Sequence, residues 1–458
     1  MLLVNRVNYL YTILLLMIHM AFALCVSMFG PAFVDLKYIL NTTIQNVSYI
    51  PTLLSIGNVI GTLVGMSYNY LNRQLVVVGL LVLMALSSTC IPFTDSLMQL
   101  YSCALVFGIG TGAWIAAYNV WLIEIWQHNA GQVLFISQLM YGTGAVLGPL
   151  LDRPYLTGDT NRSVVLDDKD RDVESLFLQS NSSTISVWER RVKLEKPFLM
   201  SGGILIVFPL IMLLMFVCKR YRLPHLDRCQ YSPLSDNPDL LMPANNDDDD
   251  DNDNGNGGHT SDIHQPNNNR LPKIRTVILL SICLSSINSL ELVYFNFGST
   301  YFQYIPVRLT APMAASMVSI MSAAYTIGQV VNFGMAFLFK TEHMITFNFM
   351  LSFITITGLT FGQNIPQLLW IVSASIGYSV SVLFPAILGF FGKYLQITDR
   401  IATLVFIMCG VVNFLPPLIL GKYIESFPSI FIIIELILLF IAFISFITFL
   451  LMRYRYLR

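Results

Sequence analysis

The sequence predicts an all-α membrane protein with twelve transmembrane helices arranged as two six-helix bundles. Two observations lead to this fold class. Charged residues are scarce outside two polar segments, and twelve apolar runs flank the second of those segments, six before it and six after it. A membrane-spanning helix needs about 20 mainly apolar residues, and each run reaches or nearly reaches that length.

The distribution of charge excludes most other classes of protein. Charged residues make up 12% of the 458-residue chain, against about 25% in a typical soluble protein. Thirty-four of the 53 charged residues lie at 152–196 and 219–275, so the other 356 residues carry only 19. An ordinary cytosolic enzyme could not cover its surface with so few charges. A net charge of −1 also gives no attraction for the phosphates of nucleic acid.

The apolar runs give the expected spans and domains. The spans lie at about 9–31, 49–70, 74–93, 97–122, 131–151, 197–218, 274–298, 312–339, 344–362, 366–392, 401–420 and 429–451. The first is too long for a signal peptide and is followed by further spans, so it should remain as a membrane helix. We therefore expect an N-terminal bundle over 1–218 with an extracellular loop at 152–196, a linker at 219–273, and a C-terminal bundle over 274–458.

Glycosylation signals and basic residues predict the orientation. The four Asn-X-Ser/Thr acceptors are Asn41, Asn46, Asn161 and Asn181, and all fall in the loops after spans one and five. Those loops share one face, so we expect that face to be extracellular and its asparagines to be glycosylated. The opposite face holds fifteen of the 26 basic residues, which favours cytoplasmic termini in a multi-pass protein of the plasma membrane.

The central segment 219–273 is expected to be a disordered cytoplasmic linker. It opens with Lys219, Arg220 and Arg222 and becomes rich in Asn and Asp, with Asp at every position of 247–251. Such a composition cannot bury enough apolar surface to fold. Calcium or partner binding is the alternative, although the Asp run lacks the alternating ligands and glycine of an EF-hand loop.

Motifs for enzyme chemistry are missing from the sequence. No pair of the seven cysteines has CxxC or zinc-ligand spacing, so we expect free thiols. GxSxG and HExxH are absent, and the P-loop-like stretch that ends at Lys393 has Tyr394 where Ser or Thr is required. We expect neither enzyme activity nor a resident metal or cofactor, with a sodium ion entering only as a co-substrate.

Polar residues within spans are candidates for function. A carboxylate at the middle of a bilayer costs several kcal/mol unless it is neutral, paired or facing water. Glu291 shares one helical face with Asn288 and Tyr294, a row that suits a hydroxyl-bearing solute or a cation. The alternative is a protonated Glu that only bonds a neighbouring helix. We expect structural roles for Glu435, alone in an aliphatic run, and for His19, with a proton relay as the alternative for His19.

Spans four and five add aromatic and amide side chains. Trp114, Tyr118 and Trp121 recur at helical spacing with Asn119 beside them. Aromatic faces stack on the C–H groups of a sugar ring while amides bond its hydroxyls. An interfacial aromatic belt is the alternative reading of this pattern. Gln138 in span five is suited to binding a ligand or a partner helix.

Longer stretches resemble a known family of transporters. The loop after span two keeps the Gly65 and Arg73 of the Gly-x-x-x-Asp-Arg-x-Gly-Arg motif of the major facilitator superfamily, with Asn69 at its acidic position. Further segments resemble the sodium-dependent glucose transporter-like branch, grouped with major facilitator superfamily domain-containing protein four. They are GPAFVDL (30–36), NVSYI (46–50), YLNRQLVVVG (70–79), YNVWLIEIW (118–126), YGTGAVLGPLL (141–151), LELVYFNFG (290–298), AAYTIGQ (323–329), SIGYSVSVLFP (375–385) and GVVNFLPPLILG (410–421).

The resemblance implies a fold and an activity. It implies a facilitator fold whose helices one, four, seven and ten line a solute site, and it suggests hexose uptake driven by sodium. Glu291 matches the helix-seven Glu of the branch and Asn119 its helix-four Asn. Asn69 and Gln329 stand where the branch usually has Asp and Arg, so its gating and ion coupling do not carry over directly.

These observations combine into one expected function. We expect a monomeric transporter that moves a small polar solute across the lipid bilayer by alternating access, a hexose such as glucose coupled to sodium. The substrate candidates are Trp114, Asn119, Gln138, Asn288, Glu291 and Tyr294, with Glu291 also coupling the ion. One alternative is a proton-coupled carrier of another small organic solute. The other is a non-transporting regulatory protein of the same fold.

Overall fold

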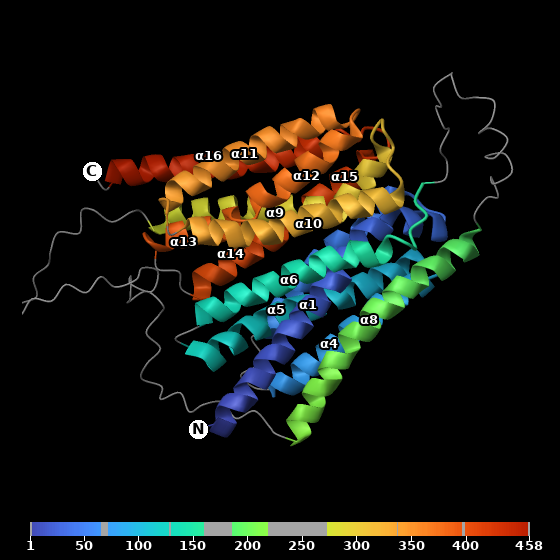
Figure 1. Ribbon diagram of the computed structural model, residues 1–458, viewed down its shortest axis with the longest axis horizontal. Helices are drawn as coiled ribbons and strands as arrows, with labels where there is room; N and C mark the ends of the chain where they lie inside the picture. Colours follow the sequence, from blue (N-terminus) through green and yellow to red (C-terminus); the bar gives the residue numbers. More distant parts are fainter. Residues whose placement is uncertain are drawn as a thin grey trace, which may run out of the picture.

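The computed structural model describes residues 2–65, 72–127, 130–159, 186–218, 273–336, 338–395 and 399–456, and these residues contain helices but no β-strand (Figure 1). Asn69, Asn161, Asn181 and the linker of 219–272 lie outside the described residues. Eleven helices of the described part are long and apolar enough to cross a membrane. The predicted all-helical membrane fold is therefore confirmed.

The helices fall into two halves, blue to green and yellow to red in Figure 1. The N-terminal half contains α1 (Leu2–Ile39), α2 (Ile44–Val47), α3 (Tyr49–Gly65), α4 (Arg73–Cys90), η2 (Ile91–Phe93), α5 (Leu97–Trp126), α6 (Ala130–Asp152) and α8 (Val187–Cys218). The C-terminal half contains α9 (Lys273–Tyr304), α10 (Ala311–Met335), α11 (Thr341–Gly362), α12 (Pro366–Val380), α13 (Leu383–Gly392), α14 (Asp399–Val412), α15 (Leu415–Tyr423) and α16 (Ile430–Tyr456). Both chain ends lie at the same end of the molecule, on opposite halves.

Two of the expected spans are interrupted. Span eleven is divided into α14 and α15 just before Pro416 and Pro417. Span ten is divided into α12 and α13 just before Pro385. Proline has no N–H for the helical ladder, and its ring disfavours a helical conformation in the residue before it. Both breaks therefore follow from the sequence, although the apolar pattern alone showed continuous spans.

Several helices extend beyond the apolar runs that predicted them. The expectation of a loop through residue 196 was wrong, because α8 begins at Val187. Ser186 accepts a hydrogen bond from the backbone N–H of Glu189 at 3.1 Å and caps this helix. Glu189 and Lys193 form an ion pair one turn apart, which supports the helix within this charged stretch. A hydropathy count cannot detect such a polar extension.

Glycines set the closest packing inside and between the halves. On α3, a Cβ added to Gly61 would stand 2.0 Å from the carbonyl oxygen of Ile109 on α5. Gly57 and Gly61 form a ridge of small residues on α3 that lets α5 approach closely. Between the halves, Gly30 of α1 lies against α9, where an added Cβ would stand 2.4 Å from the carbonyl oxygen of Phe295.

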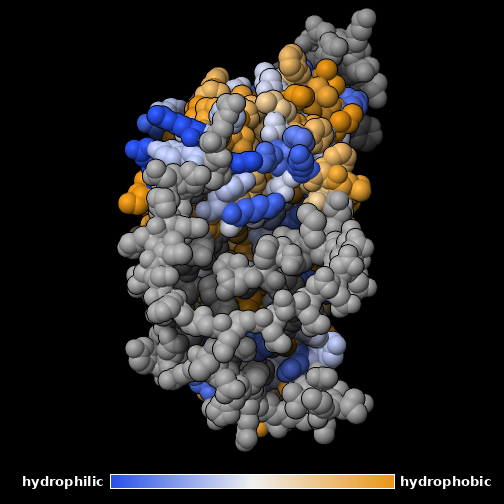
Figure 2. All heavy atoms as spheres, turned by 90° about the vertical axis from the view of Figure 1, so that its left-hand side faces the viewer, coloured by the Kyte–Doolittle hydropathy of each residue, from blue (hydrophilic) through white to orange (hydrophobic). Residues whose placement is uncertain are grey.

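Charged residues mark the end of the molecule where both chain termini lie. Figure 2 shows this face, with hydrophilic side chains gathered in a band over the upper, C-terminal half. Arg453 of α16 pairs with Glu342 at the start of α11. In the other half, Arg73 of α4 makes a two-pronged ion pair with Glu124 of α5, one N–O distance being 3.1 Å. Each pair joins two helices of the same half at this end.

Candidate solute site between the two halves

Glu291 occupies a half-buried position on α9 where the two halves meet. Its carboxylate accepts a hydrogen bond from the hydroxyl of Tyr325 on α10 at 3.3 Å. Tyr141 of α6, in the opposite half, and Cys409 of α14 both lie within electrostatic range of that carboxylate. The only intramembrane carboxylate that the sequence ranked as functional thus faces the junction of the halves.

The facing wall in the N-terminal half is aromatic. The imidazole of His19 on α1 stacks on Tyr118 of α5 with ring centroids 4.1 Å apart. It lies 5.3 Å from the ring of Tyr141. Trp114 donates its indole N–H to His19 Nδ1 at 3.3 Å. Because indole can only donate, Nδ1 must carry no proton, and His19 is held as a neutral ring within the wall.

Amides border this aromatic wall. Gln138 of α6 is exposed, and its amide donates to the hydroxyl of Tyr118 at 3.4 Å. Asn119 on α5 is half-buried, and its amide nitrogen donates to the carbonyl of Ile115 at 3.0 Å, which leaves the amide oxygen free to accept. Asn288 is half-buried one turn before Glu291. Amide side chains of this kind can both donate hydrogen bonds to hydroxyl groups and accept them.

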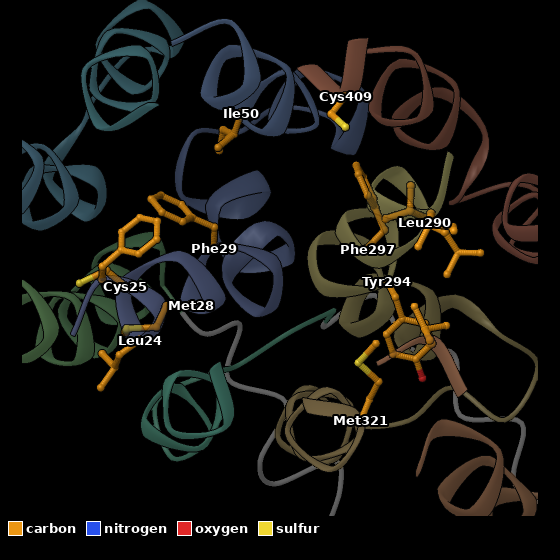
Figure 3. Packing of buried hydrophobic residues seen from close by; sticks show 14 of the residues in the cluster. Leu24, Cys25, Met28, Phe29, Ile50, Leu290, Tyr294, Phe297, Met321 and Cys409 are labelled. Atoms are coloured by element: carbon orange, nitrogen blue, oxygen red, sulfur yellow. The ribbon is translucent and has the colours of Figure 1, made fainter. Parts of the chain in front are cut away.

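Tyr294 lies elsewhere than the sequence suggested. Its hydroxyl donates to Ser373 of α12 at 2.8 Å, and its ring packs edge-on against Phe431 of α16. In Figure 3 the hydroxyl points away from α1 and into the C-terminal half. A step of three residues from Glu291 turns the side chain far enough to bury it in the core of its own half.

The structure therefore sorts the six substrate candidates. It places Glu291 on α9 and Gln138 on α6 of the opposite half, and Trp114 behind His19. Asn119 is half-buried beside Tyr118, and Asn288 is half-buried one turn before Glu291. Tyr294 belongs to the core. Tyr141 and Tyr325 were not identified from the sequence, because the sequence of an aromatic-rich span does not show which helix a given tyrosine contacts. Gln329, a polar residue one turn after Tyr325, could have indicated that this face of α10 borders the site.

Glu435 of α16, for which a structural role is expected, lies inside the C-terminal half. The residue is buried, and no hydrogen-bond partner for either carboxylate oxygen is found among the described residues. It lies within electrostatic range of Tyr294 in the core of the C-terminal half. Nothing places it at the junction with the other half.

The far end of the junction is closed by polar contacts between the halves. Lys37 of α1 pairs with Glu425, which follows α15. Lys37 also donates to the hydroxyl of Tyr304 at 3.3 Å, and that hydroxyl donates to Glu425 at 3.1 Å. Asn41, one of the candidate glycosylation sites, is exposed just beyond this cluster.

Comparison with known sequences agrees with this architecture. A family model described as Major Facilitator Superfamily matches residues 15–153. Major facilitator superfamily domain-containing protein 4A of Xenopus tropicalis is 20% identical over 446 residues, covering 92% of this chain and 87% of its own length. The 4B protein of Danio rerio is 21% identical, covering 89% and 79%. Sodium-dependent glucose transporter 1A of Mus musculus is 26% identical over 164 residues, 36% of this chain and 38% of its own.

Solved structures match the fold over nearly the whole chain. A bacterial homolog of the human lysosomal transporter Spinster, inward-facing and unoccupied, superposes with a TM-score of 0.63 at 12% identity, covering 97% of this chain and 98% of that one. A nucleoside transporter gives 0.60 at 13% identity, with 96% and 99% covered. At these identities the matches concern the fold alone.

The family match, the fold and the candidate site are all consistent with a carrier. The sequence relatives span the chain, the fold is that of solved facilitators, and the polar residues gather at the junction of two helical halves. The chain is a multi-pass membrane protein whose residues 15–153 match the Major Facilitator Superfamily model and whose fold is that of solved transporters of this kind.

Proposed function

We propose that this transporter carries a hexose such as glucose across the plasma membrane, coupled to sodium. The observation that carries the proposal is the position of Glu291, half-buried at the junction of the halves and bonded to Tyr325. A carboxylate at that depth is costly, so its placement facing the other half favours a role in binding over one in packing.

The chemistry of the surroundings favours a polyhydroxylated solute. Gln138, Asn119 and Asn288 offer amide donors and acceptors, and the aromatic wall of Tyr118 and Tyr141 offers faces for sugar C–H groups. Few charged groups approach this region, which disfavours a highly charged solute. The likeness to proteins named as sodium-dependent glucose transporters supports the same class.

Glu291 is our candidate for ion coupling. A sodium ion beside the carboxylate would neutralise a charge that the membrane disfavours, and it would be bound together with the solute. The bundles 1–218 and 274–458 would then rock about this site, and the linker 219–273 would join them on the cytoplasmic side together with both termini. Asn41, Asn46, Asn161 and Asn181 would be glycosylated on the opposite face.

Uptake by purified protein in liposomes tests the proposal. Labelled glucose, other hexoses and small organic solutes are offered with an imposed sodium gradient, an imposed proton gradient or neither. We expect glucose to accumulate only with sodium, and Glu291→Gln to abolish accumulation without loss of folded protein. Glu435→Gln, which removes the other intramembrane glutamate, is the matched control and should still accumulate the solute.

The remaining outcomes separate the alternatives. Uptake that follows the proton gradient alone would make the protein a proton-coupled carrier of whichever solute moves. If no solute moves and one partner co-purifies in fixed ratio, the regulatory alternative replaces the transport proposal. Sodium-driven accumulation that persists in Glu291→Gln would remove that residue from ion coupling.

A further inference from the structure

A second buried carboxylate lies away from the solute site, in the N-terminal half. Asp152, the last residue of α6, is 0% exposed. Neither of its carboxylate oxygens has a hydrogen-bond partner among the described residues. Buried polar groups in folded proteins are nearly always bonded, so an unpartnered carboxylate calls for an explanation, of which a bound ion is one.

Close packing of α1 and α6 brings a second acid to the same place. A Cβ added to Gly148 of α6 would stand 2.0 Å from the hydroxyl of Ser27 on α1. Beyond this contact each helix carries an acid, Asp35 four residues before the end of α1 and Asp152 as the last residue of α6. The two carboxylates lie within electrostatic range of each other.

The charge of Asp35 is already balanced. Arg190 of α8 donates to Asp35 Oδ1 at 2.7 Å, and the backbone N–H groups of Thr157 and Gly158 each donate to the same carboxylate at 3.1 Å. Arg190 also donates to the carbonyl of Gly158 at 2.7 Å. With Asp152 ionised, the three side chains carry a net charge of −1, and a buried charge must be neutralised.

Two hydroxyl groups lie near Cys25, which is a neighbour of Asp152. Cys25 of α1 lies within interaction range of Asp152 and of the hydroxyls of Ser88 on α4 and Ser201 on α8. In Figure 3 Cys25 points from α1 toward the green α8, away from the C-terminal half. The Ser88 hydroxyl is also fully buried with no hydrogen-bond partner among the described residues. Asp152 and Ser88 are thus both buried neighbours of Cys25, in a region enclosed by α1, α4, α6 and α8.

Protonation alone does not satisfy this region. A neutral Asp152 would hold an O–H donor and a C=O acceptor, and neither would find a partner in the described chain. A metal that needs several strong ligands does not fit either, because no three His, Cys, Asp or Glu residues of the described chain come together as a metal site. A hard monovalent cation fits, since it takes oxygen ligands and supplies a single positive charge.

We propose that a sodium ion binds between α1, α4, α6 and α8, held by the carboxylate of Asp152 and the hydroxyl of Ser88. Binding would neutralise the cluster and fix the outer end of α1. That end also carries Lys37, which pairs with the C-terminal half. Bound sodium would thereby influence the Lys37–Glu425 contact that closes the junction. This effect on closing rests on the proposed transport function, whereas sodium binding at Asp152 does not depend on it.

Sodium-dependent thermal stability of the purified full-length protein tests the site without any solute. The melting temperature is followed while sodium chloride replaces choline chloride at constant ionic strength, with potassium chloride in parallel and binding of radioactive sodium as a direct measure. A ligand that binds only the folded state raises stability. At ten times its Kd, sodium should raise the Tm by about 3 °C, and potassium by less.

Variants locate the effect. Asp152→Asn should remove the sodium-dependent rise, and Ser88→Ala should weaken sodium affinity roughly tenfold. Glu435→Gln, which removes a buried carboxylate of the other half, should keep the full rise. If Asp152→Asn yields no folded protein, Ser88→Ala decides: unchanged affinity would overturn the proposal.

Two further results would overturn it. One is a wild-type Tm that is equal in sodium and choline. The other is a Tm that rises on acidification with no sodium dependence at any pH, which would mean a protonated Asp152. If the protein binds no sodium in these assays but still shows sodium-driven uptake, the site at Asp152 is overturned and the transport proposal stands. Bound sodium without sodium-driven uptake would overturn the transport proposal and leave this sodium site standing.

Discussion

Lys37 of α1 and Glu425 at the end of α15 form an ion pair that joins the two halves at one end of the molecule. Both side chains are partly exposed, at 20% and 33% of their reference area. Such a pair is worth about 1 kcal/mol at most. That amount shifts a two-state equilibrium about fivefold, which is enough to bias a carrier between two states without locking it.

Breaking this pair should favour separation of the halves at this end. Ser48 is buried where α2 meets Gly421 of α15, so a cysteine placed at Ser48 reports on opening. We expect Lys37→Ala to raise the rate at which Ser48→Cys reacts with a membrane-impermeant maleimide by about fivefold. The double exchange Lys37→Glu with Glu425→Lys should restore the slow rate. An unchanged rate in Lys37→Ala would show that the pair does not hold the closed state.

Two neighbouring arginines should differ sharply in their contribution to stability. Arg190 is 2% exposed and binds the buried Asp35, whereas Arg191 pairs with Asp95, which is 76% exposed. Arg190→Ala leaves a buried carboxylate without its partner and should destabilise the protein by about 3–5 kcal/mol. Arg191→Ala should cost about 1 kcal/mol or less. Thermal unfolding of the two variants in detergent measures the difference, and similar Tm values would contradict the assigned burial.

The glycine ridge of α3 gives a test of helix packing. Gly61→Ala places a methyl group on the backbone of α5 and should cost about 1–3 kcal/mol. Gly79 of α4 has no atom within 4 Å of an added Cβ. Gly79→Ala should therefore be neutral or stabilise the helix by up to about 1 kcal/mol. The two Tm values should move in opposite directions or differ by several degrees, and equal values would be inconsistent with the close crossing.

Much of the fold could be predicted because each membrane helix is determined by the apolar residues of its own segment. The twelve expected spans follow from apolar length alone, which does not depend on what each helix contacts. The polar first turns of α8 were not recognised, because they depend on a cap and an ion pair. The helix breaks at Pro385 and Pro416 were not recognised, because each depends on single residues. Both are outside the reach of a hydropathy average.

The site was harder to predict because it depends on contacts between distant helices. Glu291 was found because a charge within a span is rare and costly. Tyr325 was not found, since nothing in its own span distinguishes it from a packing aromatic. Tyr294 was assigned to the site through its spacing from Glu291, but residues three apart on a helix still differ in direction by about 60°. That rotation directs it to Ser373.

Tyr325, which contacts Glu291, and Tyr294, which lies in the core of the C-terminal half, give a prediction with two matched variants. Tyr325→Phe removes the hydroxyl that donates to Glu291, so we expect a higher KM for the solute and an altered dependence on the coupling ion, with little change in Tm. Tyr294→Phe removes a buried hydrogen bond to Ser373 and should lower stability by about 1 kcal/mol. Its KM should stay near the wild-type value, because the hydroxyl lies in the core of the C-terminal half. Uptake kinetics in liposomes and Tm in detergent, measured on both variants, separate the two roles. If Tyr294→Phe changed KM and Tyr325→Phe did not, the solute site would have to be moved from the junction of the halves into the C-terminal half.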